Sequence, residues 1–144
     1  MTITKILVPI DGSSFSVKAF NAAIDIAKKH NAKLSILTCL EKDNLGAWYV
    51  DKRINKQIIQ NAKKLALGYL EKLETRAKKS NIAVSVNVVE AKSISQQIIA
   101  FANTKKVDLI VIGSHGRTGF KEFLLGSVTN TVSQSAKCPV LIVK

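Results

Sequence analysis

Short apolar runs alternate with amphipathic segments along the whole chain, and this alternation constrains the fold more than any other feature. Five runs rich in branched residues are each bounded by turn-forming residues, at positions 5–10, 33–40, 82–89, 107–112 and 139–143. Runs of this length and composition are typical of strands buried on both faces. Because strands that alternate with helices favour right-handed crossovers, we predict an α/β fold with a doubly wound, open sheet of five parallel strands.

The segments between these runs have the apolar period of helices. We predict helices over 16–30, over 57–79, from Ser93 onward, and over 128–136. Ser13 or Ser14 can cap the first helix, and Ser93 with Gln96 three residues later matches a capping box. The sequence contains no internal repeat or linker. We therefore expect one Rossmann-like domain over 1–144, with helices on both faces of its sheet.

Composition limits the compartment and the kinds of site. The chain has 144 residues, of which 47% are hydrophobic, and no apolar run approaches the roughly 18 residues of a membrane span. Its first residues lack the apolar core of a signal peptide. Cys39 and Cys138 lie in apolar stretches outside any CxxC pair, as buried thiols of a reducing compartment do. We expect a cytoplasmic protein without a membrane span or a metal site.

The formal net charge of +12 raises the question of an anionic partner. Pairs of lysines stand on or near the ends of predicted helices, where a cation suits the helix dipole and the solvent. Aromatic residues make up only 6% and do not interleave with the basic ones. We interpret the lysines as solvated helix faces and expect no nucleic-acid partner. A polyanion-binding face, for RNA, DNA or membrane lipids, stays open as an alternative.

Two segments of unusual composition follow predicted strands. One is 11–14, Asp-Gly-Ser-Ser, after the first strand; the other is 113–127, after the fourth. Ligands of open parallel sheets bind at the carboxyl ends of strands, near the point where strand order reverses. If the first and fourth strands are neighbours, the two segments face each other across a crevice.

The second segment has a glycine at every third position, Gly113, Gly116 and Gly119, and Gly126-Ser127 then opens the last helix. Glycines let backbone N–H groups approach a ligand closely, and helix N-termini favour anions. Arg117 could add a cation for a terminal phosphate. Neither the GxGxxG fingerprint nor the GxxxxGK[ST] loop is present. The glycine spacing alone leaves a polyphosphate cradle and an ordinary glycine-rich turn both open.

Further motifs favour the polyphosphate cradle over an ordinary turn, because they resemble those of a known family. The residues Gly113, Gly116, Gly126 and Ser127 fit the pattern glycine, two residues, glycine, nine residues, glycine, serine or threonine. The blocks KILVPIDGS, VDLIVIGSHGRTG and CPVLIVK stand at the start, in the middle and at the end of the chain. In these features the chain resembles the nucleotide-binding branch of the universal stress protein family over essentially its whole length.

The resemblance implies a stress-response sensor or regulator that binds ATP, ADP or AMP, with any Mg²⁺ held by the phosphates. No dedicated catalytic constellation is evident, so we expect little or no enzymatic activity. From this absence and the glycine pattern we also expect ATP to shift the Gly113–Gly126 loop and the dimer surface between two states. The resemblance implies a homodimer through the fifth strand, at Val140, Leu141, Ile142 and Val143. The nucleotide-binding residues that the resemblance implies are Pro9, Ile10, Asp11, Thr38 (or Cys39), Ile112, Gly113, Gly116, Gly126, Ser127, Val128 and Thr129. We add Arg117 to this set because its positive charge suits a phosphate.

Two points stay open at the level of sequence. His115, Arg117 and Asp11 near one crevice would also suit a weak ATPase or phosphotransferase, although no second metal-holding carboxylate is evident. The family often has glycine followed by Asp or Pro after the third strand, whereas this chain has Glu90-Ala91-Lys92-Ser93. The resemblance implies nothing about the long connection over 41–56.

Overall fold

The computed structural model describes residues 1–42, 52–117 and 125–144. Five strands and four helices alternate along the described chain, as the sequence predicts. Their bounds are β1 Lys5–Pro9, α1 Ser14–His30, β2 Lys33–Glu41, α2 Lys52–Lys79, β3 Val84–Ala91, α3 Ile94–Thr104, β4 Leu109–Gly113, α4 Ser127–Ser135 and β5 Val140–Val143. Much of the connection over 41–56, and Gly119 of the glycine series, lie outside the described residues.

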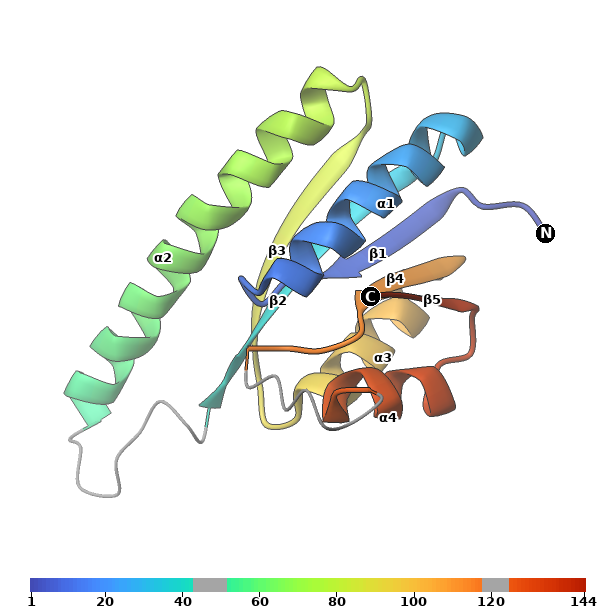
Figure 1. Ribbon diagram of the computed structural model, residues 1–144. Helices are drawn as coiled ribbons and strands as arrows, with labels where there is room; N and C mark the ends of the chain where they lie inside the picture. The colour runs from blue at the N-terminus through green and yellow to red at the C-terminus, as the bar shows by residue number, and fades with distance from the viewer. Residues whose placement is uncertain (43–51, 118–124) are drawn as a thin grey trace.

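All five strands are parallel and lie in the order β3-β2-β1-β4-β5. Helices α1 and α2 cover one face of the sheet and α3 and α4 cover the other (Figure 1). The first layer buries a core around Ile6, Val8, Phe20 and Leu70. The second buries Leu7, Ile110 and neighbours against α3 and α4. The doubly wound α/β prediction is confirmed.

Serine side chains begin two helices as the sequence predicts. The Oγ atom of Ser13 accepts a hydrogen bond from Ser16 N at 3.2 Å, and Ser93 Oγ accepts one from Gln96 N at 3.4 Å. These bonds satisfy backbone donors that a helix leaves unpaired at its N-terminus. Pro9 is the last residue of β1, where the absent N–H costs the sheet least.

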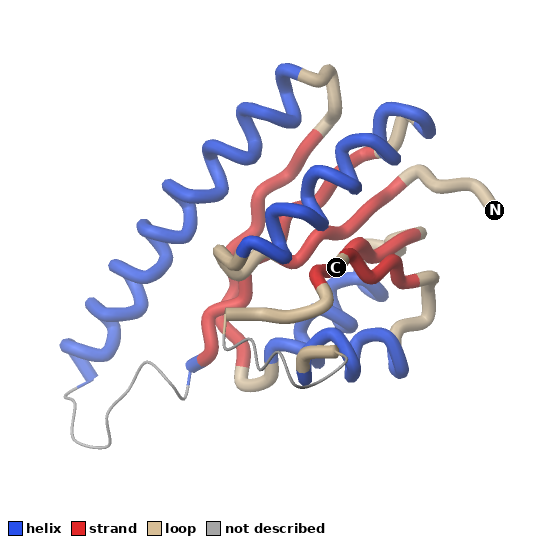
Figure 2. Tube along the Cα trace, in the orientation of Figure 1, coloured by secondary structure: helices blue, strands red, loops and turns tan. Residues whose placement is uncertain are grey.

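The start of the third and fourth strands differs from the prediction by two residues. Ile82 N donates to Ala77 O at 3.1 Å, and Val107 N donates to Ala102 O at 2.9 Å. Both residues therefore close the preceding helix, although they are apolar and buried like the strand residues that follow them. Helix α2 also begins earlier than predicted, at Lys52. Figure 2 shows the three-layer arrangement that results, with the strands between two groups of helices.

Candidate functional site

The loops that follow β1 and β4 leave the same edge of the sheet side by side. The two strands are direct neighbours, with Ile6 paired to Leu109 and Leu7 to Ile110. Strand β2 lies on the other side of β1, so the strand order reverses here. The first and fourth strands are therefore neighbours, as the predicted shared crevice requires. We call residues 10–14, 113–117 and 125–128 the loop junction.

The carboxylate of Asp11 connects the two loops. A Cβ atom added to Gly116 would lie 2.9 Å from Asp11 Oδ2, so any larger residue here would push the carboxylate away from the loop. The other oxygen, Oδ1, accepts a hydrogen bond from Ser13 N at 2.9 Å. Gly12 between them has φ +82°, a conformation that glycine adopts without strain. A Cβ on Gly12 would lie 3.4 Å from the Arg117 guanidinium, which places that cation in the loop junction.

Close backbone approach explains two more glycines of the pattern. A Cβ on Gly113 would lie 2.8 Å from the carbonyl carbon of Phe15, in the first turn of α1. A Cβ on Gly126 would lie 3.3 Å from the Cα of His115. Gly126 N also donates to Ser114 O at 2.7 Å. The glycines thus bring α1, the β4 loop and α4 into direct contact.

Two helix N-termini meet at the loop junction. Helix α1 is capped by Ser13, whereas the N-cap of α4 is Gly126, which forms no side-chain cap. The first N–H groups of a helix lack intrahelical partners, and the helix dipole gives this end a partial positive charge. Neither first turn contains an acidic residue, and Ser127 is exposed there. This geometry suits a bound anion.

Two predicted hydroxyls are already hydrogen-bonded within the protein. Thr38 Oγ1 donates to Ile10 O at 2.8 Å, and Thr129 Oγ1 donates to Gly113 O at 2.7 Å. Thr129 is buried. These bonds hold the ends of β1 and β4 in place. Of the remaining predicted residues, Ile112 is buried, and Pro9 and Val128 are half-buried.

Comparison with known proteins decides the family. The model of the Universal stress protein family matches residues 2–144. This chain belongs to that family. Universal stress protein YxiE of Bacillus subtilis is 38% identical over 146 residues, covering 97% of this chain and 98% of its own.

Solved structures agree with the family and the fold. The structure of the protein MJ0577 has a TM-score of 0.90 and 26% identity, and the match covers 100% of this chain and 97% of that one. A universal stress protein in complex with cAMP has a TM-score of 0.69 and 28% identity, covering 99% and 98%. Some structural relatives of this universal stress protein therefore bind nucleotides.

The sequence did not single out Ser114 and Phe15 as parts of the site. Ser114 is 2% exposed, and its Oγ lies 2.9 Å from His115 Nδ1. The rings of His115 and Phe15 have centroids 5.2 Å apart. These contacts hold the imidazole against the first turn of α1. The sequence did offer one indication of Ser114, which is its position directly after a buried strand and before His115.

Thr38 and Cys39 were predicted as alternative nucleotide-binding residues. They lie on opposite faces of β2 because side chains alternate along a strand. Like Val89 and Ile94, Cys39 packs against the core that α3 and α4 cover. Burial raises the pKa of the Cys39 thiol to about 12. At neutral pH the thiol is therefore uncharged and presents an apolar surface.

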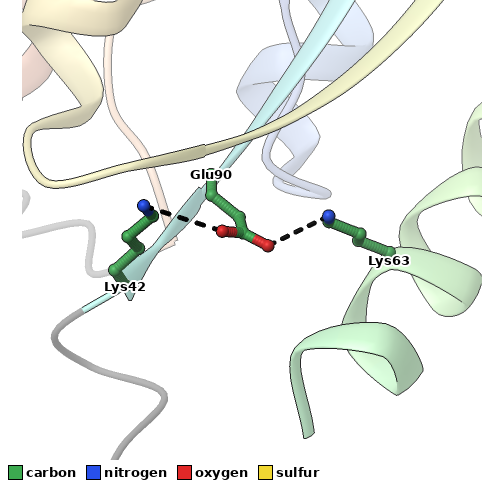
Figure 3. Close-up of polar contacts among 3 residues, drawn as sticks. All are labelled: Lys42, Lys63 and Glu90. Atoms are coloured by element: carbon green, nitrogen blue, oxygen red, sulfur yellow. Dashed lines mark ion pairs between the residues drawn. The ribbon is translucent and has the colours of Figure 1, made fainter. Parts of the chain in front are cut away.

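Glu90, in the segment that departs from the family pattern, links three elements. Its carboxylate lies between Lys42 at the end of β2 and Lys63 of α2 (Figure 3). Lys63 Nζ is 2.9 Å from Oε1, and Lys42 Nζ is 3.8 Å from Oε2. The hydrogen bond from Lys63 is the largest cause that lowers the pKa of Glu90. This cluster joins α2 to the ends of β2 and β3.

Two kinds of feature are not found in the part of the chain that the structure describes. None of its helices combines the length and the apolar character that crossing a bilayer requires. Within residues 1–42, 52–117 and 125–144, no three His, Cys, Asp or Glu side chains gather in a way that could hold a metal ion.

Proposed function

We propose that this universal stress protein binds ATP at the loop junction and acts as a nucleotide-dependent sensor or regulator in the stress response. The observation that carries the proposal is the contact between Asp11 and Gly116 beside the uncapped N-terminus of α4. Asp11 would hold the adenosine, and the backbone N–H groups around Gly126 and Ser127 would bind the phosphates. The relative that was solved with cAMP, at 28% identity, supports an adenine nucleotide as ligand.

Arg117 would contribute charge to phosphate binding. Its guanidinium already lies next to Gly12, within the loop junction. Any Mg²⁺ would be held mainly by the phosphates and by water, as is usual for this ion. ATP can act as a signal only if it binds one state of the protein better than another.

Replacement of single serines of α4 by alanine tests the proposed phosphate position. Ser127→Ala removes an exposed hydroxyl at the helix N-terminus, and we expect ATP affinity to fall about tenfold, as loss of a hydrogen bond to a charged group does. Ser133→Ala is the matched control, because Ser133 lies in the same helix away from its N-terminus and its hydroxyl donates to Asn130 O. Calorimetric titration measures both variants. Equal affinities for the two would contradict the proposed phosphate position.

We also propose that the protein forms a homodimer through β5. This strand lies at the edge of the sheet, and Leu141 at its centre is 40% exposed. Unpaired apolar edge strands favour association. Leu141→Lys should yield monomers in sedimentation velocity. The control Leu65→Lys, which alters an exposed leucine of α2, should leave the dimer intact; a dimer unaffected by Leu141→Lys would refute this interface.

A further inference from the structure

The amino ends of β1, β2 and β3 form a second polar site, at the opposite end of the sheet from the loop junction. A cavity of ≈ 280 Å³ opens there between the strands and the end of α3. Three lysines and two serines contribute to its lining. We call it the basic corner, and its lining residues are Lys5, Lys33, Leu34, Ser35, Ala83, Val84, Ser85 and Lys105.

The lysines and serines of the strands lie on one face of the sheet. Lys5 pairs with Lys33 and Ser35 with Ser85 across neighbouring strands. Side chains at every second position share a face, so Lys5 is on the same face as Leu7, which packs under α3 and α4. Parallel sheets are usually apolar on both faces. The basic corner is thus a polar region on a face that is mainly apolar around Leu7, Leu37 and Ile110.

Positive charge is concentrated in the corner. Parallel strands lie about 4.8 Å apart, and like charges directly opposite one another destabilise a sheet. Lys5 Nζ donates to the carbonyl of Lys105 at 3.2 Å, which brings the end of α3 over the strands. The nearby Asp108 carboxylate accepts hydrogen bonds from Thr4 N, Thr4 Oγ1 and Lys5 N.

Neither Lys33 nor Lys105 forms an ion pair with a carboxylate among the described residues. The residues that line the cavity thus include three lysines and no acidic residue, and the Asp108 carboxylate already accepts hydrogen bonds from the Thr4 and Lys5 backbone. An anion in the corner would relieve the repulsion between Lys5 and Lys33.

A chain of hydrogen bonds orients one further donor. Asn87 Nδ2 donates to Ser85 Oγ at 3.3 Å, and Ser85 Oγ donates to Ser35 Oγ at 3.1 Å. Because Ser35 Oγ accepts the hydrogen bond from Ser85, its own hydroxyl proton can still be donated to a ligand. Within the described residues it has no acceptor. The corner thus offers ammonium groups and a hydroxyl donor together.

We propose that the basic corner binds a phosphate or pyrophosphate group of a small molecule. Lysine ammonium groups and hydroxyl donors recognise phosphate oxygens through charge-assisted hydrogen bonds. Pockets for drug-sized ligands begin near ~300 Å³, so this cavity suits a small ligand. Its lining contains no aromatic residue on which a nucleic-acid base could stack. The site is independent of the ATP site, since the two lie at opposite ends of the strands.

Titration with pyrophosphate, followed by NMR of backbone amides, tests this proposal on the whole chain. We expect shifts centred on Lys33, Ser85 and Lys105. The double variant K33Q/K105Q should bind about tenfold more weakly, because two of the three cations are lost. The control K28Q/K64Q loses the same charge at exposed positions of α1 and α2 and should bind as the unaltered protein does.

Lys33 and Lys105 are exposed and form no ion pair among the described residues, so the double variant should fold. Its ATP affinity at the loop junction should also be unchanged, which separates this site from the proposed function. Shifts spread over all surface lysines, or equal losses in the two double variants, would overturn the proposal. So would binding only to vesicles that contain phosphatidic acid and not to free pyrophosphate.

Discussion

At the scale of single residues, glycines and short polar side chains determine the geometry of the loop junction. A Cβ atom at Gly113 would collide with the Phe15 backbone, one at Gly116 would displace the Asp11 carboxylate, and one at Gly126 would crowd the Cα of His115. The contact at Gly113 leaves no room for a Cβ atom, whereas the neighbours of Gly116 and Gly126 would have to move slightly to admit one. Packing therefore gives the family pattern a physical cause in this chain.

Gly113→Ala should destabilise the protein by about 1–3 kcal/mol, the usual cost of overpacking a filled interior. The new methyl group would meet the Phe15 backbone, which cannot move without shifting α1. Gly68→Ala is the matched control, because nothing lies within 4 Å of a Cβ placed at that helical position. It should stabilise the fold by up to about 1 kcal/mol. Urea unfolding measures both, and equal effects would refute the packing argument.

Sequence reasoning identified most of these residues, but not their contacts. The glycine spacing and Asp11 were visible as a pattern, and the structure explains them by close approach. Ser114 and Phe15 were missed because a serine or phenylalanine beside a turn has many ordinary roles. The basic corner was also invisible, since Lys5, Lys33 and Lys105 come together only through strand register and the position of α3.

At the scale of elements, helix ends and strand ends are joined by a few polar contacts. Residues in the left-handed conformation end three helices, at Asn31, Asn81 and Lys106. The apolar residue that follows closes each helix by a hydrogen bond to its last turn. Apolar periodicity cannot separate such a residue from the strand beyond it, and this is why two strand starts were predicted two residues early.

Asp108 joins the beginning of β1 to the beginning of β4. Hydrogen bonds from the Thr4 side chain and then the Thr4 backbone are the largest causes that lower its pKa. Asp108→Asn should reduce the free energy of unfolding by about 1 kcal/mol near neutral pH, since one acceptor oxygen and the charge are lost. The exposed Asp25→Asn in α1 is the control and should have little effect.

The effect of Asp108→Asn should depend on pH. Because the folded protein holds the carboxylate at a lower pKa than the unfolded chain does, its contribution is present above about pH 4. It is lost as the pH falls through the folded pKa, so the two proteins should converge in acid. Unfolding curves over this range measure the difference, and a difference that is independent of pH would contradict the account.

Glu90→Gln should loosen the first half of α2. The variant removes the charge that Lys42 and Lys63 share, whereas the second half of the helix stays fixed by Leu70, Leu73 and Ala77. We expect faster amide hydrogen exchange in the first half only. Glu74→Gln, which breaks the pair with Lys78 near the other end, is the control. Uniform exchange along α2 in both variants would refute the role of Glu90.

At the scale of the whole molecule, the parallel sheet separates the two proposed sites. The loop junction lies at the carboxyl ends of β1 and β4, and the basic corner lies at the amino ends of β1, β2 and β3. Alternating apolar runs predicted this architecture fully, including the helices on both faces. The net charge of +12 did not predict where an anion would bind, because charge totals carry no spatial information.

The most direct test of the central claim is calorimetric titration of the nucleotide-free protein with ATP at physiological salt, followed by AMP and cAMP. The account predicts micromolar binding of ATP, about −8 kcal/mol, that is weakened by Ser127→Ala and unaffected by Ser133→Ala. The absence of binding heat at several temperatures would contradict it. In that case the loop junction would be a packing motif without a nucleotide ligand.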